Sequence, residues 1–382
     1  MLDLKNHPYF EEYTDPKSGV VSYILTEKTA DMQKHFYFSE SSLTDDGKYL
    51  WIRCVNPPSG CEYLAVVSMD AGNPLIRPFL TTAGMGMYGE NCPRVVPCSH
   101  DAIFAMGTDI WRITVDGDIT KIFSLPQDLI KGRKVSSVST HCSLSADGKY
   151  VAIDAEIGNR SYVGYGDIAT GEFILLNSFD RHYEHIQFSP VKPELLLVDQ
   201  DGHNDLFTGE FTNIDIRTWL MDTKKTRFEP LLPNAWYTRG GVEYCHDFFS
   251  EDGQVCFVDY KTGAFECYVD TRELNHVWKR PLCHCHTIDR MLWVGDNTPY
   301  AWAQRPCETM FFDRETGKEI AIFSELPFPE FGRFMHCDPH PSFTKDMKYV
   351  ISTVTLLDGK VDVAITPVEP LLKLCRENGT VV

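Results

Sequence analysis

The chain has 382 residues, of which 43% are hydrophobic and 24% are charged, and it carries a formal net charge of −18 at pH 7. This composition is typical of a folded globular protein, and no apolar run approaches the roughly 20 residues that a membrane-spanning helix needs. The acidic balance argues against nucleic acid as a partner, because phosphate binding requires clustered Lys and Arg side chains.

The N-terminal stretch MLDLKNHPYFEEYTDPKSG lacks the basic start and the apolar segment of a secretory signal. We therefore expect a cytoplasmic protein without a membrane partner; the sequence does not indicate its oligomeric state. The 13 cysteines are scattered, without a CxxC pair, and several lie in apolar strand patterns such as WIRCVNP and GQVCFVDY. This favours reduced, buried thiols over disulfides or a zinc cluster.

One type of segment recurs along the chain: an apolar residue, usually Ser or Thr, a turn that resembles Asp-Gly, and an alternating apolar strand. The copies are LTDDGKYLWI at 43, VPCSHDAIFAM at 96, LSADGKYVAI at 144, FSPVKPELLLV at 188, FSEDGQVCFV at 249, TIDRMLWVGD at 287 and FTKDMKYVIS at 343. A second series of hairpin turns, each opening with Asp, alternates with these copies. Both series recur at about 50 residues, which is a period of repeat proteins.

Short strands at this period predict an all-β fold, a seven-bladed β-propeller in which each repeat is one four-stranded blade. A hairpin turn at Asp15 precedes the first complete copy, and another at Asp358 follows the last. This arrangement predicts that the N-terminal strands complete the last blade and close the ring. We expect residues 1–382 to form one propeller domain; the alternative is a two-sheet sandwich repeated in tandem.

Histidines recur at one position of the repeat. Four of them lie six residues before the turn Asp or its equivalent, and a fifth lies five residues before it; they are His141, His185, His246, His340 and His284. The strand before such a turn is the innermost strand of a propeller blade, so these side chains should converge on one mouth of the central channel. The alternative is a structural role in hydrogen bonding, above all for His141 and His185.

The stretch FMHCDPHPSF places His336, Asp338 and His340 within five residues, and His284 and His286 have the same alternate spacing. Alternate residues of a strand point to the same side, so each set could offer several ligands to one metal ion. Mixed imidazole and carboxylate ligands suit Mn, Zn, Fe or Ni better than Ca. Three cysteines alternate with these residues and are expected to be packed thiols on the opposite face: Cys283, Cys285 and Cys337.

Arg217 lies inside an apolar strand in the segment DIRTWLMD. An arginine in that environment must meet an anion, or its burial carries a desolvation cost. A carboxylate substrate would bind the guanidinium in a bidentate manner. The sequence therefore predicts that Arg217 contacts an acidic ligand.

Five segments together resemble the oligogalacturonate lyases, seven-bladed propellers that degrade short pectin fragments inside bacteria. They are HYEHIQFSP at 182, DIRTWLMD at 215, CHDFFSEDG at 245, HCHTIDRMLWVGD at 284 and HPSFTKDMKYV at 340. The resemblance implies β-elimination on short oligogalacturonides of the digalacturonate class. A base removes the C5 proton of a uronate, the glycosidic oxygen at C4 leaves, and a divalent cation, typically Mn²⁺, holds the carboxylate.

Carried over to this sequence, the resemblance implies that His246 is the base and that Arg217 contacts the acidic sugar. His340 matches a metal ligand, and either His284 or His286 matches another. We also expect His141 and His185 to contact the substrate.

The chain departs from the family pattern Gln-x-x-His-Pro-His-Pro-Ser-Phe, in which Gln and both His bind metal. The same columns here read Met335, Asp338 and His340. Met is a poor ligand for a hard divalent ion, whereas Asp can replace His and adds negative charge. His336 could supply a further ligand.

Two other functions fit the same sequence. The first is a propeller that has kept the fold but lost the chemistry, and that serves as a sugar-binding or protein-interaction module. The changes at Met335 and Asp338 are its main support. The second is a lyase or epimerase for a different uronate, which would share the step of proton abstraction.

Overall fold

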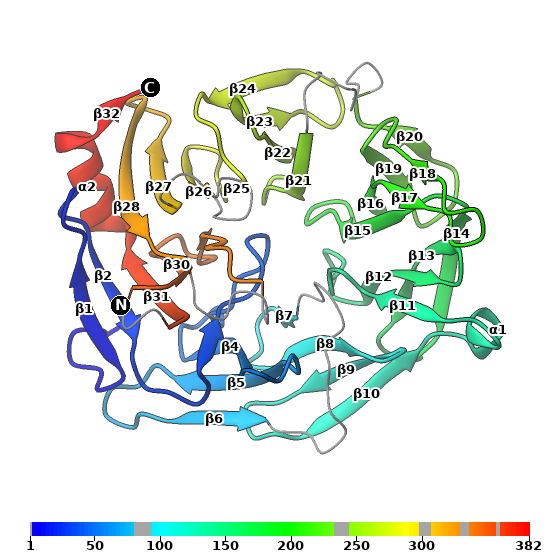
Figure 1. Cartoon of the computed structure of the whole chain (residues 1–382), viewed down its shortest axis with the longest axis horizontal. Helices are drawn as coiled ribbons and strands as arrows, with labels where there is room; N and C mark the ends of the chain where they lie inside the picture. Colours follow the sequence, from blue (N-terminus) through cyan, green and yellow to red (C-terminus); the bar gives the residue numbers. More distant parts are fainter. Residues whose placement is uncertain (1, 80–92, 233–243, 298–306, 329–335, 357–359) are drawn as a thin grey trace.

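The computed structural model describes residues 2–79, 93–232, 244–297, 307–328, 336–356 and 360–382. Seven sheets of four or five strands surround a central axis (Figure 1), which confirms the all-β, seven-bladed propeller. The radial arrangement of the sheets contradicts the tandem sandwich that we considered as the alternative.

Four blades follow one another in the first part of the chain, each with its strands in sequence order from the axis outward. Their strands are β3 (Met32–Lys34), β4 (Tyr49–Val55), β5 (Tyr63–Ser68), β6 (Ile76–Phe79), β7 (Arg94–Val95), β8 (Ala102–Met106), β9 (Asp109–Ile113), β10 (Ile119–Ser124), β11 (Val135–Val138), β12 (Tyr150–Ile157), β13 (Arg160–Asp167), β14 (Phe173–Phe179), β15 (Tyr183–Phe188), β16 (Leu195–Gln200), β19 (Thr218–Asp222) and β20 (Phe228–Pro230). Helix α1 (Gln127–Ile130) precedes β11, and the hairpin of β17 (His203–Asn204) and β18 (Phe211–Thr212) is inserted between β16 and β19.

Three further blades complete the ring. Their strands are β21 (Tyr244–Phe249), β22 (Val255–Asp259), β23 (Gly263–Cys267), β24 (Leu274–Trp278), β25 (His284–His286), β26 (Leu292–Asp296), β27 (Cys307–Asp313), β28 (Lys318–Leu326), β29 (Ser342–Phe343), β30 (Tyr349–Val354) and β31 (Asp362–Pro367). Helix α2 (Val368–Asn378) follows, and β32 (Thr380–Val381) pairs with the outer edge of β28. No helix among the described residues is long and apolar enough to cross a membrane.

The last blade is completed from the other end of the chain. Strand β2 (Val21–Leu25) pairs with β31, with Ile24 opposite Ala364, and β1 (Phe10–Thr14) pairs with β2. The resulting sheet has the order β1-β2-β31-β30-β29. This confirms the prediction that N-terminal strands close the ring.

Four of the repeated turns share one hydrogen bond, from a Ser or Thr hydroxyl to an Asp carboxylate two residues later. The pairs are Thr44–Asp46, Ser145–Asp147, Ser250–Asp252 and Thr344–Asp346. Three of the turns then place Gly at a positive φ, and in the fourth Met347 takes that place with φ 55°. An Asp that bonds within its own turn and a residue in the left-handed region are what such turns require.

The core lies between neighbouring blades. Val163 of β13 and Leu196 of β16 belong to one buried cluster, and Leu220 of β19 and Phe257 of β22 belong to another. Each side chain of this size contributes about 1.5–3 kcal/mol when it is fully buried. The apolar strands therefore hold the sheets face to face around the axis and fix where their inner ends lie.

Asp15 links the last blade to its neighbour. Its buried carboxylate accepts hydrogen bonds from the backbone N–H and the hydroxyl of Ser324 on β28, both at 2.8 Å, and from Ser18. Burial acts to raise the pKa of Asp15, but these hydrogen bonds outweigh it and lower the pKa. The ionised carboxylate therefore stabilises the folded chain.

Replacement of Asp15 by Ala should lower the free energy of unfolding by about 2 kcal/mol at pH 7, because a hydrogen bond to a charged group contributes about 1.5–3 kcal/mol. The folded pKa lies below the unfolded value of about 3.9, so this stabilisation is present above that pH and is lost as the pH falls through the folded pKa. Urea unfolding at several pH values measures the difference. Asp116→Ala, at a side chain that is 82% exposed, is the control and should change stability little. Equal stability of wild type and Asp15→Ala at pH 7 would contradict this account.

Candidate metal centre and active site

Three buried side chains from two blades meet at the inner strands. His284 begins β25, and Asp338 and His340 lie in the segment that leads into β29. One ligand atom from each of the three lies within 4.8 Å of the others, and the rings of His284 and His340 are 4.3 Å apart. The structure therefore brings together three of the five predicted metal ligands.

Asp296 orients two of these ligands. It faces His284 across the pairing of β25 with β26, and its carboxylate accepts a hydrogen bond from His284 Nδ1 at 3.0 Å. The same carboxylate accepts the backbone N–H of His340 at 2.9 Å. A carboxylate on the second ring nitrogen fixes the tautomer of a metal-binding histidine, so Nε2 of His284 is left for a metal.

The donor set fits a divalent cation. Nε2 of His340 is buried and has no hydrogen-bond partner among the described residues, although buried polar atoms are usually paired. Imidazole nitrogens and a carboxylate are ligands that Mn²⁺ and related ions accept. A metal ion would satisfy His340 Nε2, His284 Nε2 and Asp338 together.

The other two predicted ligands lie differently. Nε2 of His336 is 2.5 Å from Oδ2 of Asp338, so this partly exposed histidine pairs with a member of the cluster. His286 is not in the cluster: its Nδ1 accepts the backbone N–H of Phe343 at 3.0 Å and its ring stacks on Phe248. Burial lowers the pKa of His286 to about 3. Met335, the departure from the family pattern, lies outside the described residues.

His246 lies beside the cluster, with its ring 4.1 Å from that of His284. The register of β21 and β22 shifts between Cys245 and Phe248, and His246 has a φ of 55° within this bulge. A bulge redirects side chains and often lies next to an active site. His185 and His340 also have positive φ, so three of the five recurring histidines share a backbone conformation that is uncommon outside Gly.

The hydrogen bond of His246 defines which nitrogen is free. Nδ1 donates to the carbonyl oxygen of Cys283 at 2.5 Å, which leaves Nε2 with its lone pair. Burial, then the proximity of His284 and the charge of Arg217, lower the pKa of His246 well below its usual value. The imidazole is therefore neutral at pH 7 and able to accept a proton.

Cys283 does not point to the opposite face from His284, so that expectation was wrong. Its Sγ lies 3.9 Å from Nε2 of His284, and His246, Cys283 and His284 form a second group of ligand atoms within 4.8 Å. Cys283 precedes β25, where the alternation of strand side chains has not begun. Cys285, inside the strand, packs in the core with Trp293 as predicted.

Arg217 meets anions supplied by the protein itself. Its guanidinium lies 3.2 Å from Asp199, 3.4 Å from Asp201 and 3.4 Å from Asp247, the residue after His246. Asp199 and Asp247 are buried, whereas the side chain of Asp201 is 39% exposed. Burial and the neighbouring carboxylate of Asp247 raise the pKa of Asp199 well above its usual value. The anion predicted for Arg217 is thus present without a ligand.

His141 and His185 contact each other, with Nε2 of the first 2.9 Å from Nδ1 of the second. Glu184 accepts from Nε2 of His185 at 3.2 Å and from Nε2 of His182 at 3.2 Å. Burial acts to lower the pKa of His182, but the hydrogen bond to Glu184 and the negative charges of the nearby carboxylates together outweigh it and raise the pKa to about 9. These residues form a separate polar chain in the third and fourth blades.

Sequence reasoning missed the aromatic side chains between the two histidine groups. The ring of Tyr37, from the first blade, lies 5.2 Å from His141 and 4.7 Å from His340. Phe38 lies 5.3 Å from the ring of His284. Both aromatics are buried, so blade one supplies the packing that separates the histidine chain from the metal cluster. The segment KHFYFSE, rich in aromatics immediately after β3, was the available signal.

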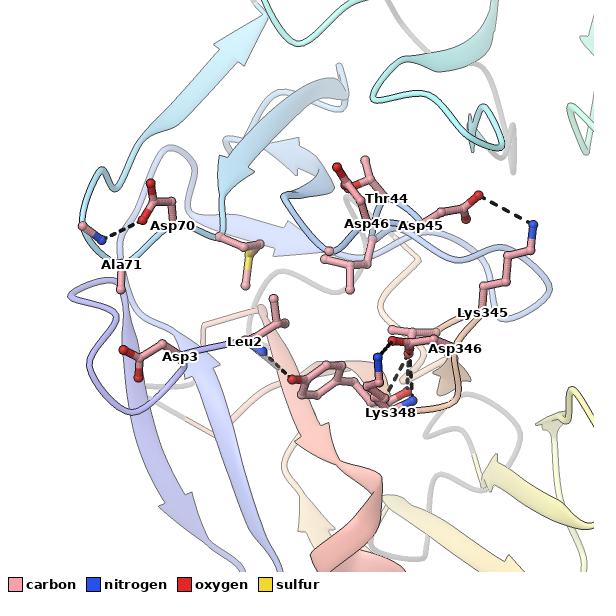
Figure 2. A pocket seen from close by; sticks show the side chains of 16 residues that line it. Leu2, Asp3, Thr44, Asp45, Asp46, Asp70, Ala71, Lys345, Asp346 and Lys348 are labelled. Carbon is pink, nitrogen blue, oxygen red and sulfur yellow. Dashed lines mark hydrogen bonds and ion pairs between the residues drawn. The ribbon is translucent and has the colours of Figure 1, made fainter.

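Two pockets lie at the ends of the inner strands where the repeated turns are, and both are lined by residues of these turns. A cavity of 230 Å³ is lined by residues of all seven blades, including His286 and Phe343. Figure 2 shows another, of 630 Å³, between the turn at 43–47 and the turn at 344–349. Both lysines that line it pair with aspartates of the same lining, Lys345 with Asp45 and Lys348 with Asp346. Neither pocket contains a member of the His284 cluster.

Comparison with known proteins supports the resemblance. No protein-family model matches the chain. An oligogalacturonate lyase of Dickeya dadantii is 26% identical over 214 residues, which is 51% of this chain and 52% of that protein, so the match spans about half of the relative's length.

Two solved structures share the fold over 94% of this chain and 96% of their own. One is an oligogalacturonate lyase in complex with manganese, with a TM-score of 0.75 and 17% identity. The other is an oligogalacturonate lyase from Vibrio parahaemolyticus, with a TM-score of 0.73 and 16% identity. The predicted resemblance to the oligogalacturonate lyases is thereby confirmed, and the propeller is the fold of those structures.

Proposed function

We propose that the protein is a metal-dependent lyase that cleaves short oligogalacturonides by β-elimination. The observation that carries this proposal is the position of His246, whose free Nε2 belongs to a ring 4.1 Å from a ligand of the buried His284, Asp338 and His340 cluster. A base beside a cation site is the arrangement that proton abstraction next to a carboxylate needs. The similarity to oligogalacturonate lyases supports the same substrate class.

In this mechanism, Nε2 of His246 accepts the C5 proton of the uronate and the C–H electrons form the C4–C5 double bond. The glycosidic oxygen leaves C4 with the C–O bonding electrons and takes up a proton from water. The carbonyl of Cys283 holds Nδ1–H of His246, so the ring keeps its orientation as it gains the proton. When bound, a divalent ion such as Mn²⁺ would neutralise the substrate carboxylate and make the neighbouring proton more acidic.

We propose His284, Asp338 and His340 as the metal ligands, with His336 orienting Asp338 through their 2.5 Å contact. His286 is hydrogen-bonded to Phe343 and is not a member of the cluster, which favours His284 over His286 as the ligand from β25. Mn²⁺ is the expected cofactor, because a carboxylate beside two imidazoles suits a harder divalent ion.

Arg217 would contact the substrate through Nη1. Asp199 and Asp247 are buried and would lose the guanidinium as a partner if Arg217 moved away, and a buried polar group without a partner is costly. Asp201 is the exposed partner, 3.4 Å from Nη1, so a uronate carboxylate can replace it without uncovering a buried anion. We propose that His141 and His185 contact the more distant sugar, on the other side of Tyr37.

The test combines metal analysis with an assay on digalacturonate. Protein purified without chelator should contain one transition-metal ion for each chain and should generate the ultraviolet absorbance of the unsaturated product when Mn²⁺ is supplied. Metal without activity would redirect the search to another uronate, by elimination or epimerisation. Absence of both would favour the sugar-binding or protein-interaction module.

Asp296→Asn should lower the affinity for Mn²⁺ by about 10–100-fold, since loss of an outer carboxylate partner has effects of that size. The amide cannot accept from both His284 and the backbone of His340 as the carboxylate does. Titration of the chelator-treated protein with Mn²⁺ measures the change. Asp154→Asn is the matched control, because Asp154 is equally buried and accepts from Thr140 instead of a histidine. Equal losses in both variants would refute an orienting role for Asp296.

A further inference from the structure

The ligand atoms around His284 fall into two overlapping groups of different chemistry. His284, Asp338 and His340 offer nitrogen and oxygen, whereas His246, Cys283 and His284 offer nitrogen and sulfur. Thiolate ligands select soft or borderline ions such as Zn²⁺ and Cd²⁺, and carboxylates suit harder ions such as Mn²⁺. We propose that His246, Cys283 and His284 form a second metal site, which binds a thiophilic divalent ion and excludes the Mn²⁺ site.

The geometry is close to that of a tetrahedral site. Zn–S and Zn–N bonds of about 2.3 Å and 2.0–2.1 Å place the two donor atoms about 3.5 Å apart. Sγ of Cys283 and Nε2 of His284 are 3.9 Å apart, so a movement of a few tenths of an ångström is enough. The S–H proton leaves to solvent when the sulfur–metal bond forms.

The two sites exclude each other because they share one atom. Nδ1 of His284 is held by Asp296 at 3.0 Å, so only Nε2 can bind a metal. An ion at Cys283 therefore removes a ligand from the site of Asp338 and His340, and an ion at that site removes a ligand from Cys283.

The second site also uses the proposed base. Nδ1 of His246 is engaged by the carbonyl of Cys283, so His246 would bind the ion through Nε2, the nitrogen that accepts the substrate proton. Occupation would block elimination as well as displace Mn²⁺. This consequence depends on the function proposed above, whereas the existence of the site does not.

Cobalt reports the sulfur ligand directly. Chelator-treated full-length protein titrated with Co²⁺ should show a thiolate-to-cobalt charge-transfer band in the near ultraviolet. The band should persist in Asp338→Ala and in the matched control Cys285→Ser, at a thiol two residues away. It should be absent from Cys283→Ser and Cys283→Ala, and the affinity for Zn²⁺ should fall by more than about 100-fold, since even outer-partner losses reach that size. A wild-type protein without the band, or a band that survives both Cys283 variants, would overturn the site.

Activity distinguishes this inference from the proposed function. Zn²⁺ should inhibit the Mn²⁺-dependent reaction, and raising Mn²⁺ should raise the Zn²⁺ concentration needed for half inhibition. If that concentration does not change with Mn²⁺, the two sites do not exclude each other. A cobalt band without lyase activity would refute the lyase alone, and Mn²⁺-dependent activity without a band would refute the second site alone.

Discussion

Loss of the imidazole at position 246 is expected to reduce the rate of elimination by about 100- to 10,000-fold, the usual contribution of a general base. Alanine lacks the nitrogen that accepts the proton in the proposed mechanism, and it places no charge near His284. The affinity for Mn²⁺ should change little, because His246 is not in the group of His284, Asp338 and His340. The initial rate of product absorbance and a Mn²⁺ titration, made on the same preparation, measure both quantities.

His276→Ala is the matched control for His246→Ala. His276 lies on β24, the outer strand of the same blade, where Nε2 contacts the carbonyl of Thr262. This variant should keep the wild-type rate. Substantial activity in His246→Ala, with His276→Ala also active, would remove His246 from the mechanism and direct attention to another base.

Replacement of His340 by alanine has the second large expected effect, on metal affinity. Among the residues that the structure describes, Nε2 of His340 is buried and has no hydrogen-bond partner, as expected of an atom that binds the proposed cation. Loss of an outer partner of a ligand lowers metal affinity by about 10–100-fold, and loss of the ligand itself should exceed that range. Calorimetric titration of chelator-treated protein with Mn²⁺ measures the change, and activity should fall with it.

His286→Asn tests whether His286, the other candidate ligand on β25, binds the metal. The amide oxygen can still accept the backbone N–H of Phe343, as Nδ1 of His286 does, so the variant should fold and bind Mn²⁺ within about twofold of wild type. If His286→Asn loses the metal and His340→Ala keeps it, the assignment of ligands is wrong.

Much of the architecture was predictable because it rests on local chemistry that repeats. One copy of the repeat, such as the turn at Ser250 and Asp252 with the strand that follows, already indicates a turn and a strand. Seven copies indicate a repeat fold. Hairpin turns before the first copy and after the last were enough to predict that the N-terminal strands complete the last blade, although the second of these turns, at Asp358, lies outside the described residues. The histidines occupy one position of the repeat, and equivalent positions of neighbouring blades face the same channel. The sequence therefore predicted that His284 and His340, from different blades, lie close together.

Other parts of the site depend on atoms that periodicity does not describe. Alternation predicts that Cys283 opposes His284, but the rule holds only inside a strand, and Cys283 precedes β25. The positive φ of His246 arises in a bulge, and no residue typical of turns at that position predicts it. Asp296 was detectable, since the second strand of several blades carries a buried Asp at a similar place, as Asp154 and Asp199 do. The two buried carboxylates near Arg217, Asp199 and Asp247, come from β16 and β21, so their meeting is a property of the assembled blades.

The pairing of β2 with β31 has a consequence for biosynthesis. The two strands lie side by side although Ile24 and Ala364 are at opposite ends of the chain. Because the chain is synthesised from its N-terminus, β2 emerges six blades before β31 and has no strand to pair with on that edge until then. Contacts between such distant residues also form slowly. During synthesis, the edge of β2 that later pairs with β31 therefore stays exposed until the end of the chain has emerged.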